Sequence, residues 1–205
     1  MILERLVAAL ITGSIRLLTG VQARWIGCAP SPIQRVYFAN HSSHVDFVLL
    51  WSVLPTALRR RTRPVAAKDY WSRGVLRRFL IHRVFHGLLI ERAGFHRDDN
   101  PLNAMLQALK AGDSLILFPE GTRGRGGEIQ PFKAGVFHLA EARPDVELIP
   151  AFIDNAWRVM PKGAALPIPL LCSVAFGKPL RFVGGESRPD FLERSRRSLV
   201  ELGKA

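Results

Sequence analysis

Short apolar runs alternate with longer amphipathic stretches along most of this chain. Runs rich in β-branched and aromatic residues predict strands over residues 35–39, 63–67, 87–91, 114–118, 146–153 and 171–176. Apolar positions at helical spacing predict helices near residues 44–54, 70–84, 101–111, 134–142 and 189–202. Strand followed by helix, repeated, is typical of a single α/β domain with a mixed, partly parallel sheet flanked by helices.

The first twenty residues are apolar but interrupted by charge. On a helix, Arg5, Thr12, Arg16 and Thr19 gather on one flank and leave a broad apolar face on the other side. The uninterrupted apolar stretch, residues 6–15, is too short to span a bilayer. The pattern therefore favours an amphipathic helix that lies in a membrane interface.

We expect residues 1–30 to form this membrane-associated part and residues 31–205 to form the α/β domain. Two alternatives remain for the amino-terminal helix. It is an ordinary helix packed on its own domain, or it is a cleaved signal peptide, although no small-x-small cleavage site directly follows it.

Composition narrows the class of partner. The 205 residues suit one well-buried core, and 29 Lys and Arg against 17 acids give a formal charge of +12. Such a charge favours an anionic partner: nucleic acid, an acidic membrane surface or a phosphorylated small molecule. Cys28 and Cys172 stand far apart without a CxxC spacing, which argues against a disulfide framework and a cysteine zinc site and fits a reducing cytosol.

The end of the first predicted strand, "FANHSSHVDF" (38–47), carries candidate chemistry. In one interpretation Ser43 simply caps the following helix, with Asp46 favoured by the dipole of the first turn. In the other, the loop folds His41 back over that turn, and Asp46 accepts the proton of its Nδ1 atom. Nε2 of His41 is then available as a general base, and the substrate supplies the nucleophile.

The second histidine of this stretch, His44, has no acid at a better spacing, and we expect it to be structural or exposed to solvent. A metal site made of His41, His44 and Asp46 lacks further ligands at a recognisable spacing, so no metal is expected.

A second strand end, "SLILFPEGTRGRGGEIQPFKAG" (114–135), opens into a glycine-rich loop. Pro119 ends the strand ladder, and glycines let backbone amides approach an anion closely. The loop lacks the Walker pattern, but Arg123 can bind a phosphate through paired donors. The alternative is a long surface loop with solvated charges.

Taken together, these two strand ends resemble the glycerolipid acyltransferases. "NHSSHVD" is similar to their NHxxxxD block and "FPEGTRG" to their FPEGTR block, while "GLLIER" (87–92) and "LIPAFI" (148–153) resemble two further blocks in the same order. The resemblance covers about residues 36–155. By pattern, the lysophosphatidic acid acyltransferases are the most similar members.

The resemblance implies a role for each matching residue. His41 would be the base and Asp46 its orienting acid. The acceptor site would be lined by Glu120, Gly121, Thr122 and Arg123, with Arg92 beside Arg123 around the acceptor's phosphate. Lys68 and Lys133 stand where family members often carry lysines.

The implied reaction moves a fatty acyl group from acyl-CoA or acyl carrier protein to the sn-2 hydroxyl of lysophosphatidic acid, giving phosphatidic acid. The thioester is a co-substrate, and no cofactor is implied. Two departures concern the phosphate site: Glu91 precedes Arg92, and Gly124 follows Arg123. An inward-pointing Glu91 would weaken phosphate binding. Another lysolipid or an alcohol remains an alternative acceptor.

A basic segment, residues 59–97, holds eleven Lys or Arg against two acids, with apolar residues between them. We expect it to face anionic lipid headgroups at the cytoplasmic side of the cell membrane. It would equally suit the phosphates of coenzyme A, an acidic acyl carrier protein, or simple solvation. A basic nucleic-acid-binding protein is the alternative from another class, but no RRM, KH, zinc-finger or helix-turn-helix signature occurs, so no nucleic acid is expected.

Overall fold

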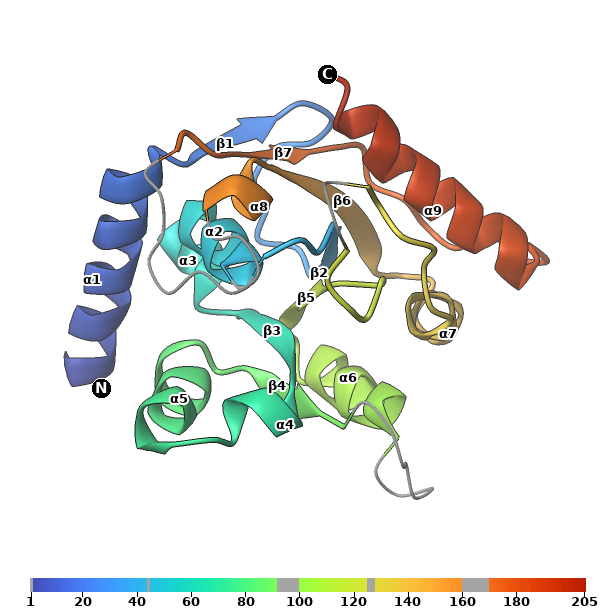
Figure 1. Cartoon of the computed structure of the whole chain (residues 1–205). Helices are drawn as coiled ribbons and strands as arrows, with labels where there is room; N and C mark the ends of the chain where they lie inside the picture. The colour runs from blue at the N-terminus through green and yellow to red at the C-terminus, as the bar shows by residue number, and fades with distance from the viewer. Residues whose placement is uncertain (1, 44, 92–99, 125–127, 160–169) are drawn as a thin grey trace.

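The computed structural model describes residues 2–43, 45–91, 100–124, 128–159 and 170–205 (Figure 1). These residues form one seven-stranded sheet in the order β1-β7-β6-β2-β5-β3-β4. The strands are β1 (Gln22–Trp25), β2 (Arg35–Ala39), β3 (Thr62–Ala67), β4 (Leu88–Ile90), β5 (Ser114–Leu117), β6 (Glu147–Asp154) and β7 (Ser173–Phe176). Neighbouring strands are parallel except β6 and β7, which are antiparallel. The predicted single α/β domain with a mixed sheet is confirmed.

Helices cover both faces of this sheet (Figure 1). They are α1 (Ile2–Thr19), α2 (Asp46–Val53), α3 (Thr56–Arg59), α4 (Lys68–Trp71), α5 (Val75–Phe79), the π-helix η1 (Leu80–Val84), α6 (Pro101–Lys110), α7 (Gly135–Ala142), α8 (Ala156–Val159) and α9 (Arg188–Leu202).

The central strand β2 is buried on both faces because its sequence, RVYFA, is almost wholly apolar. Successive side chains of a strand point to opposite faces. Tyr37 therefore packs in the cluster below α1, α2 and η1, while Val36 and Phe38 pack in the cluster below α6, α7 and α9. The β2 carboxyl end is consequently fixed from both sides, which matters for the residues that follow it.

Helix α1 turns its polar flank inward. Thr12 and Thr19 are buried, and the Arg16 guanidinium donates to the Ser52 carbonyl of α2 at 2.9 Å. The opposite face exposes large apolar side chains, namely Ile2, Leu3, Leu6, Leu10 and Leu17. None of the helices in the described residues combines the length and the apolar character needed to cross a bilayer.

Several predicted boundaries differ from the structure. The helix expected over 70–84 is divided into α4, α5 and η1, because Gly74 adopts a φ of +78° between the first two. Ser43 does not cap α2, whose N-cap residue is Val45 without a side-chain cap. Strand β1 was not predicted. The amino-terminal helix ends at Thr19, and residues 22–25 form β1, which pairs with β7 in the sheet.

Candidate active site

His41 lies in the loop between β2 and α2, and its ring is oriented by an acid. Nδ1 of His41 is 2.8 Å from Oδ2 of Asp46, so the contact predicted from the sequence is present. The His41 side chain is 19% exposed and lines a cavity, whereas Asp46 is fully buried. With Nδ1 held by Asp46, Nε2 is the ring nitrogen that can exchange a proton with a molecule in the cavity.

Asp46 also shapes the loop that carries the histidine. Its Oδ2 atom accepts the backbone N–H groups of Ser42 at 2.6 Å and Ser43 at 2.8 Å. The acid at the first position of α2 therefore pulls the preceding loop over the helix start, and the same oxygen meets the His41 ring. Two backbone N–H groups and the His41 ring thus converge on one buried oxygen.

Glu120 connects the histidine to the glycine-rich loop. Its Oε1 atom accepts the His41 backbone N–H at 2.6 Å, and its Oε2 atom accepts the Gln130 backbone N–H at 2.9 Å. The backbone N–H of Gly124 in turn donates to the His41 carbonyl at 2.8 Å. Burial raises the pKa of Glu120, and the two backbone bonds act in the opposite direction. Both sides of the His41 peptide are thus held by this loop.

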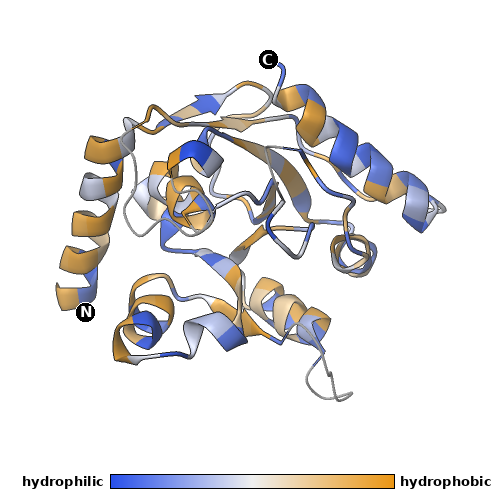
Figure 2. Ribbon diagram, in the orientation of Figure 1, coloured by the Kyte–Doolittle hydropathy of each residue, from blue (hydrophilic) through white to orange (hydrophobic). Residues whose placement is uncertain are grey.

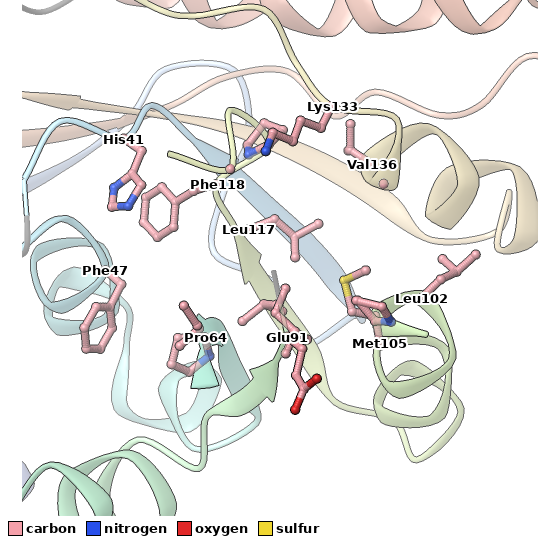
Figure 3. Close-up of a pocket in the computed structure, with 18 of the residues that line it drawn as sticks. His41, Phe47, Pro64, Glu91, Leu102, Met105, Leu117, Phe118, Lys133 and Val136 are labelled. Carbon is pink, nitrogen blue, oxygen red and sulfur yellow. The ribbon is translucent and has the colours of Figure 1, made fainter. Parts of the chain in front are cut away.

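The cavity in front of His41 has a volume of about 620 Å³ (Figure 3). Arg123 and Lys133 line it together with His41, and its other polar residues include Asp69, Glu91, Asn100 and His138. Phe118 stacks against the His41 ring with the ring centroids 4.5 Å apart. The remaining wall is largely apolar and comes from β3, β4, α4, α6 and α7, including Val65, Trp71, Ile90, Leu102, Met105 and Val136. The cavity therefore combines a histidine, charged side chains of both signs and an apolar surface.

Gly121 is needed at the turn before Arg123. Its φ is +71°, and a Cβ atom there would lie 2.7 Å from Cε of Lys133. Only glycine lets the lysine side chain cross this turn without displacement. The Lys133 backbone N–H donates to the Pro119 carbonyl at 2.8 Å, which brings the two ends of the loop together.

The structure brings together some of the predicted site residues and separates others. Asp46 stands directly behind His41, and the cavity wall includes His41, Gly121, Arg123 and Lys133. Three other predicted residues, Glu120, Thr122 and Lys68, are not part of the cavity wall. Glu120 is only 3% exposed and binds backbone amides instead. Arg92 and His44 lie outside the described residues.

Glu91, which departs from the pattern of the resembled family, forms an ion pair in the structure. Glu91 lines the cavity, and its Oε1 atom lies 2.7 Å from Nζ of Lys68. The acid thus pairs with the cation that the sequence placed in the acceptor site. Both side chains are substantially exposed, so this ion pair contributes little to stability.

Two residues that shape the site were not predicted from the sequence. We expected Phe118 to be the last residue of a strand. Its ring instead stacks against the ring of His41. Asn40 is buried, and its side chain makes a pair of bonds with the backbone of Ile153, at 2.9 and 2.8 Å. An asparagine directly before a histidine at a strand end was the available signal. Among the described residues, no three His, Cys, Asp or Glu side chains gather to hold a metal ion.

Residues 29–154 match the family model described as Acyltransferase. A relative named 1-acyl-sn-glycerol-3-phosphate acyltransferase from Limnanthes douglasii is 30% identical over 189 residues, covering 87% of this chain and 61% of its own length. One of the same name from Salmonella typhimurium is 31% identical over 127 residues, covering 58% of this chain and 46% of its own length. The chain thus spans only part of these relatives.

A solved structure shares the fold. The 1-acyl-sn-glycerophosphate (LPA) acyltransferase PlsC from Thermotoga maritima superimposes with a TM-score of 0.75 at 20% identity, covering 98% of this chain and 80% of that one. The family match extends from the segment before β2 to the end of β6, and so includes His41, Asp46 and the glycine-rich loop. This chain belongs to the Acyltransferase family.

Proposed function

We propose that this protein transfers a fatty acyl group from a thioester to the free sn-2 hydroxyl of lysophosphatidic acid, giving phosphatidic acid. One observation carries the proposal: a histidine backed by a buried aspartate lines an apolar cavity beside Arg123 and Lys133. The names of the Limnanthes and Salmonella relatives point to the same reaction.

His41 acts as the base. Its Nε2 atom takes the proton of the acceptor hydroxyl while that oxygen attacks the thioester carbonyl. Asp46 holds the ring in the required tautomer and stabilises the imidazolium that forms. The tetrahedral intermediate then collapses, its C–S bond breaks, and the thiolate leaves or takes the proton from His41. The acyl group moves directly to the acceptor, so no nucleophile of the protein and no cofactor takes part.

The two ends of the acceptor meet different parts of the cavity. Arg123 and Lys133 bind the phosphate, since a guanidinium and an ammonium provide charged donors. The apolar wall formed by residues such as Leu102, Met105 and Val136 covers an acyl chain. The donor is acyl-CoA or the acyl form of acyl carrier protein.

The outer face of α1 supports a place at the membrane. Ile2, Leu6 and Leu10 are 77%, 63% and 70% exposed, and residues 2, 3, 6, 10 and 17 fall within about 100° of one helical face. Such a stripe suits the boundary between headgroups and acyl chains. We place the protein at the cytoplasmic surface of the cell membrane, lying on it through α1.

Thiol release measures the reaction directly. Purified protein is given lysophosphatidic acid with acyl-CoA or with acylated carrier protein, and the free thiol is followed. Release should require both substrates and should fall about a hundred to ten thousand fold in His41→Ala. His82→Ala, an exposed histidine on η1, is the matched control and should retain the activity. Full release by His41→Ala would contradict the assignment of the base.

Loss of Arg123 tests the acceptor. Arg123→Ala should raise the KM for lysophosphatidic acid by about tenfold or more and leave the donor KM unchanged, because a bidentate contact to phosphate is lost. A monoacylglycerol, which has no phosphate, should be a poor acceptor for both proteins. Arg197→Ala, on the exposed side of α9, is the control. Equal use of the phosphate-free acceptor by the unaltered protein would favour an alcohol or another lysolipid instead.

A further inference from the structure

Residues 72–76, which comprise the turn after α4 and the first two residues of α5, form an exposed segment that we call the apolar tip. All five residues are exposed, and Val75 and Leu76, the last two, are 76% and 69% exposed. Gly74, at a φ of +78°, makes the turn that places them there. Single exposed apolar side chains are ordinary on protein surfaces. Two adjacent ones at the tip of a turn, with Arg73, Arg77 and Arg78 beside them, need a physical reason.

This apolar tip is attached to the wall of the cavity. Tyr70 and Trp71, the last residues of α4, line the cavity and directly precede the tip. The Arg77 guanidinium lies over the Tyr70 ring, 4.3 Å from its centroid, and Nη1 of Arg77 lies 3.5 Å from the Tyr70 carbonyl. A cation over an aromatic face is an attractive contact. Arg77, the residue after the tip, therefore packs on the cavity wall.

The helix that follows the apolar tip leads to a contact with the start of α1. Helix α5 continues directly into η1, whose Arg83 pairs with Glu4 of α1 at 2.7 Å. Ile2 and Leu3, in the first turn of α1, are 77% and 62% exposed. Figure 2 shows hydrophobic residues along α1 and a mixture of hydrophobic and hydrophilic residues at α5. The segment that begins at the cavity wall with Tyr70 and Trp71 and runs through the apolar tip and α5 therefore ends against α1 at η1.

We propose that the apolar tip is a second membrane contact, which seats the cavity on an anionic bilayer and lets a lipid acceptor enter beside Tyr70 and Trp71. Val75 and Leu76 enter the boundary between headgroups and acyl chains, while Arg73 and Arg78 bind anionic headgroups. The cationic neighbours select a bilayer with acidic lipids over a neutral one. This inference rests on the proposed function for the identity of the lipid that enters.

Vesicle partitioning tests the contact apart from catalysis. The full chain and the double variant Val75→Ser/Leu76→Ser are mixed with vesicles of phosphatidylcholine containing a quarter phosphatidylglycerol, and the bound fraction is measured. The variant should bind about tenfold more weakly or worse. Arg73→Gln and Arg78→Gln should each weaken binding about fivefold at low salt, with less effect on neutral vesicles. Binding unchanged in all three variants would overturn the proposal.

A matched control removes the same kind of side chain elsewhere. Ile33 and Val183 are 47% and 59% exposed and lie outside α1, α4 and α5. Ile33→Ser/Val183→Ser should bind vesicles as the unaltered chain does. Equal loss in this control would mean that general surface hydrophobicity drives the binding, which would also overturn the proposal. Thermal melts of every variant establish that each is folded.

Two acceptor forms separate entry from chemistry. With long-chain lysophosphatidic acid embedded in vesicles, kcat/KM of Val75→Ser/Leu76→Ser should fall in step with vesicle binding. With a short-chain acceptor dissolved as monomers, its activity should equal that of the unaltered chain. An equal loss with the monomeric acceptor would overturn the entry route. A rise only in the KM for acylated carrier protein, with vesicle binding retained, would assign the tip to that protein instead.

The two proposals fail in different ways. If the unaltered chain turns over neither acceptor, the proposed reaction is wrong, and the vesicle measurement still reports on the membrane contact. If it turns over the monomeric acceptor while the tip variants bind vesicles normally, the reaction stands and the second contact is wrong.

Discussion

Glu120 belongs to the FPEGTR-like block, but its carboxylate accepts hydrogen bonds from backbone N–H groups of the loops around the cavity. Its two oxygens hold the amides of His41 and Gln130, and the side chain is buried behind the cavity wall. Arg123, three positions later, lines the cavity. We interpret Glu120 as a residue that positions the base rather than one that touches the acceptor.

Replacing this carboxylate separates the two roles. In Glu120→Gln the amide nitrogen cannot accept a hydrogen bond, so one of the two backbone N–H groups is left unpaired. We expect kcat to fall about tenfold or more, since small displacements of a base are costly, and the KM for the acceptor to stay unchanged. Glu128→Gln, an exposed neighbour, is the control. A raised acceptor KM with full kcat would instead put Glu120 in contact with the acceptor.

Stability should carry a pH signature of the same residue. Burial raises the pKa of Glu120 in the folded protein above its ordinary value. The folded state therefore binds this proton more tightly than the unfolded state does. The contribution of Glu120 to stability is greatest below the unfolded pKa and is lost as pH rises through the folded pKa.

Urea denaturation of the unaltered chain and of Glu120→Gln, at several pH values from acid to neutral, measures this contribution. The difference in free energy of unfolding should move in favour of the glutamine variant as pH rises. A difference that stays constant over the whole range would show that burial does not perturb this carboxyl.

At this scale the sequence predicted local contacts and missed distant ones. The His41–Asp46 contact was predictable because five positions and one loop separate the residues. The partners of Glu120 were not, because the bond to His41 spans 79 positions and exists only after β2 and β5 pair. Because every residue carries backbone groups, the residue types do not show which backbone groups a side chain will bind.

At the scale of elements, Asn40 continues the pairing of β2 with β6 beyond the last strand residue. Its side-chain amide bonds both the N–H and the C=O of Ile153 as a further strand residue would. The chain can then turn away toward α2 while the sheet stays fully bonded. His41 begins from a point that is fixed by this side chain.

Truncation of Asn40 should therefore affect both stability and rate. Asn40→Ala leaves two buried backbone groups unpaired, which costs about 1–3 kcal/mol for each group. Urea denaturation should show the loss, and kcat should fall at temperatures where the variant is folded. Asn103→Ala, on the exposed side of α6, should change neither quantity. Unaltered stability in Asn40→Ala would mean that water replaces the amide.

The strands whose bounds the sequence predicted most accurately are those with apolar side chains on both faces. β2 and β5 are fully buried and were predicted nearly to their ends. β1, with the sequence QARW, lies at the edge of the sheet, where alternate side chains remain exposed, and its short polar pattern predicts nothing. The break at Gly74 was missed because a glycine within a helical pattern does not by itself decide between a kink and an end.

At the scale of the whole molecule, the reactivity of the two cysteine thiols can be used to follow unfolding. Both cysteines are free. Burial raises the pKa of Cys172 to about 11, and burial also raises that of Cys28. We expect a thiol reagent to label the native protein slowly and to label both residues once urea unfolds it. Rapid native labelling would show that these regions open locally. The slow reaction also keeps the background low in assays of thiol release.

The cavity is lined by residues that follow a central strand of the sheet and by residues of an edge strand. His41 follows β2, which lies between β5 and β6 in the interior of the sheet, while Ile90 and Glu91 belong to or follow β4, a three-residue strand at its edge. Edge strands open at low free energy, whereas central ones open only with the whole domain. The part of the cavity wall at β4 can therefore be altered while the base stays in register, so changes to the shape of the cavity are best sought along β4.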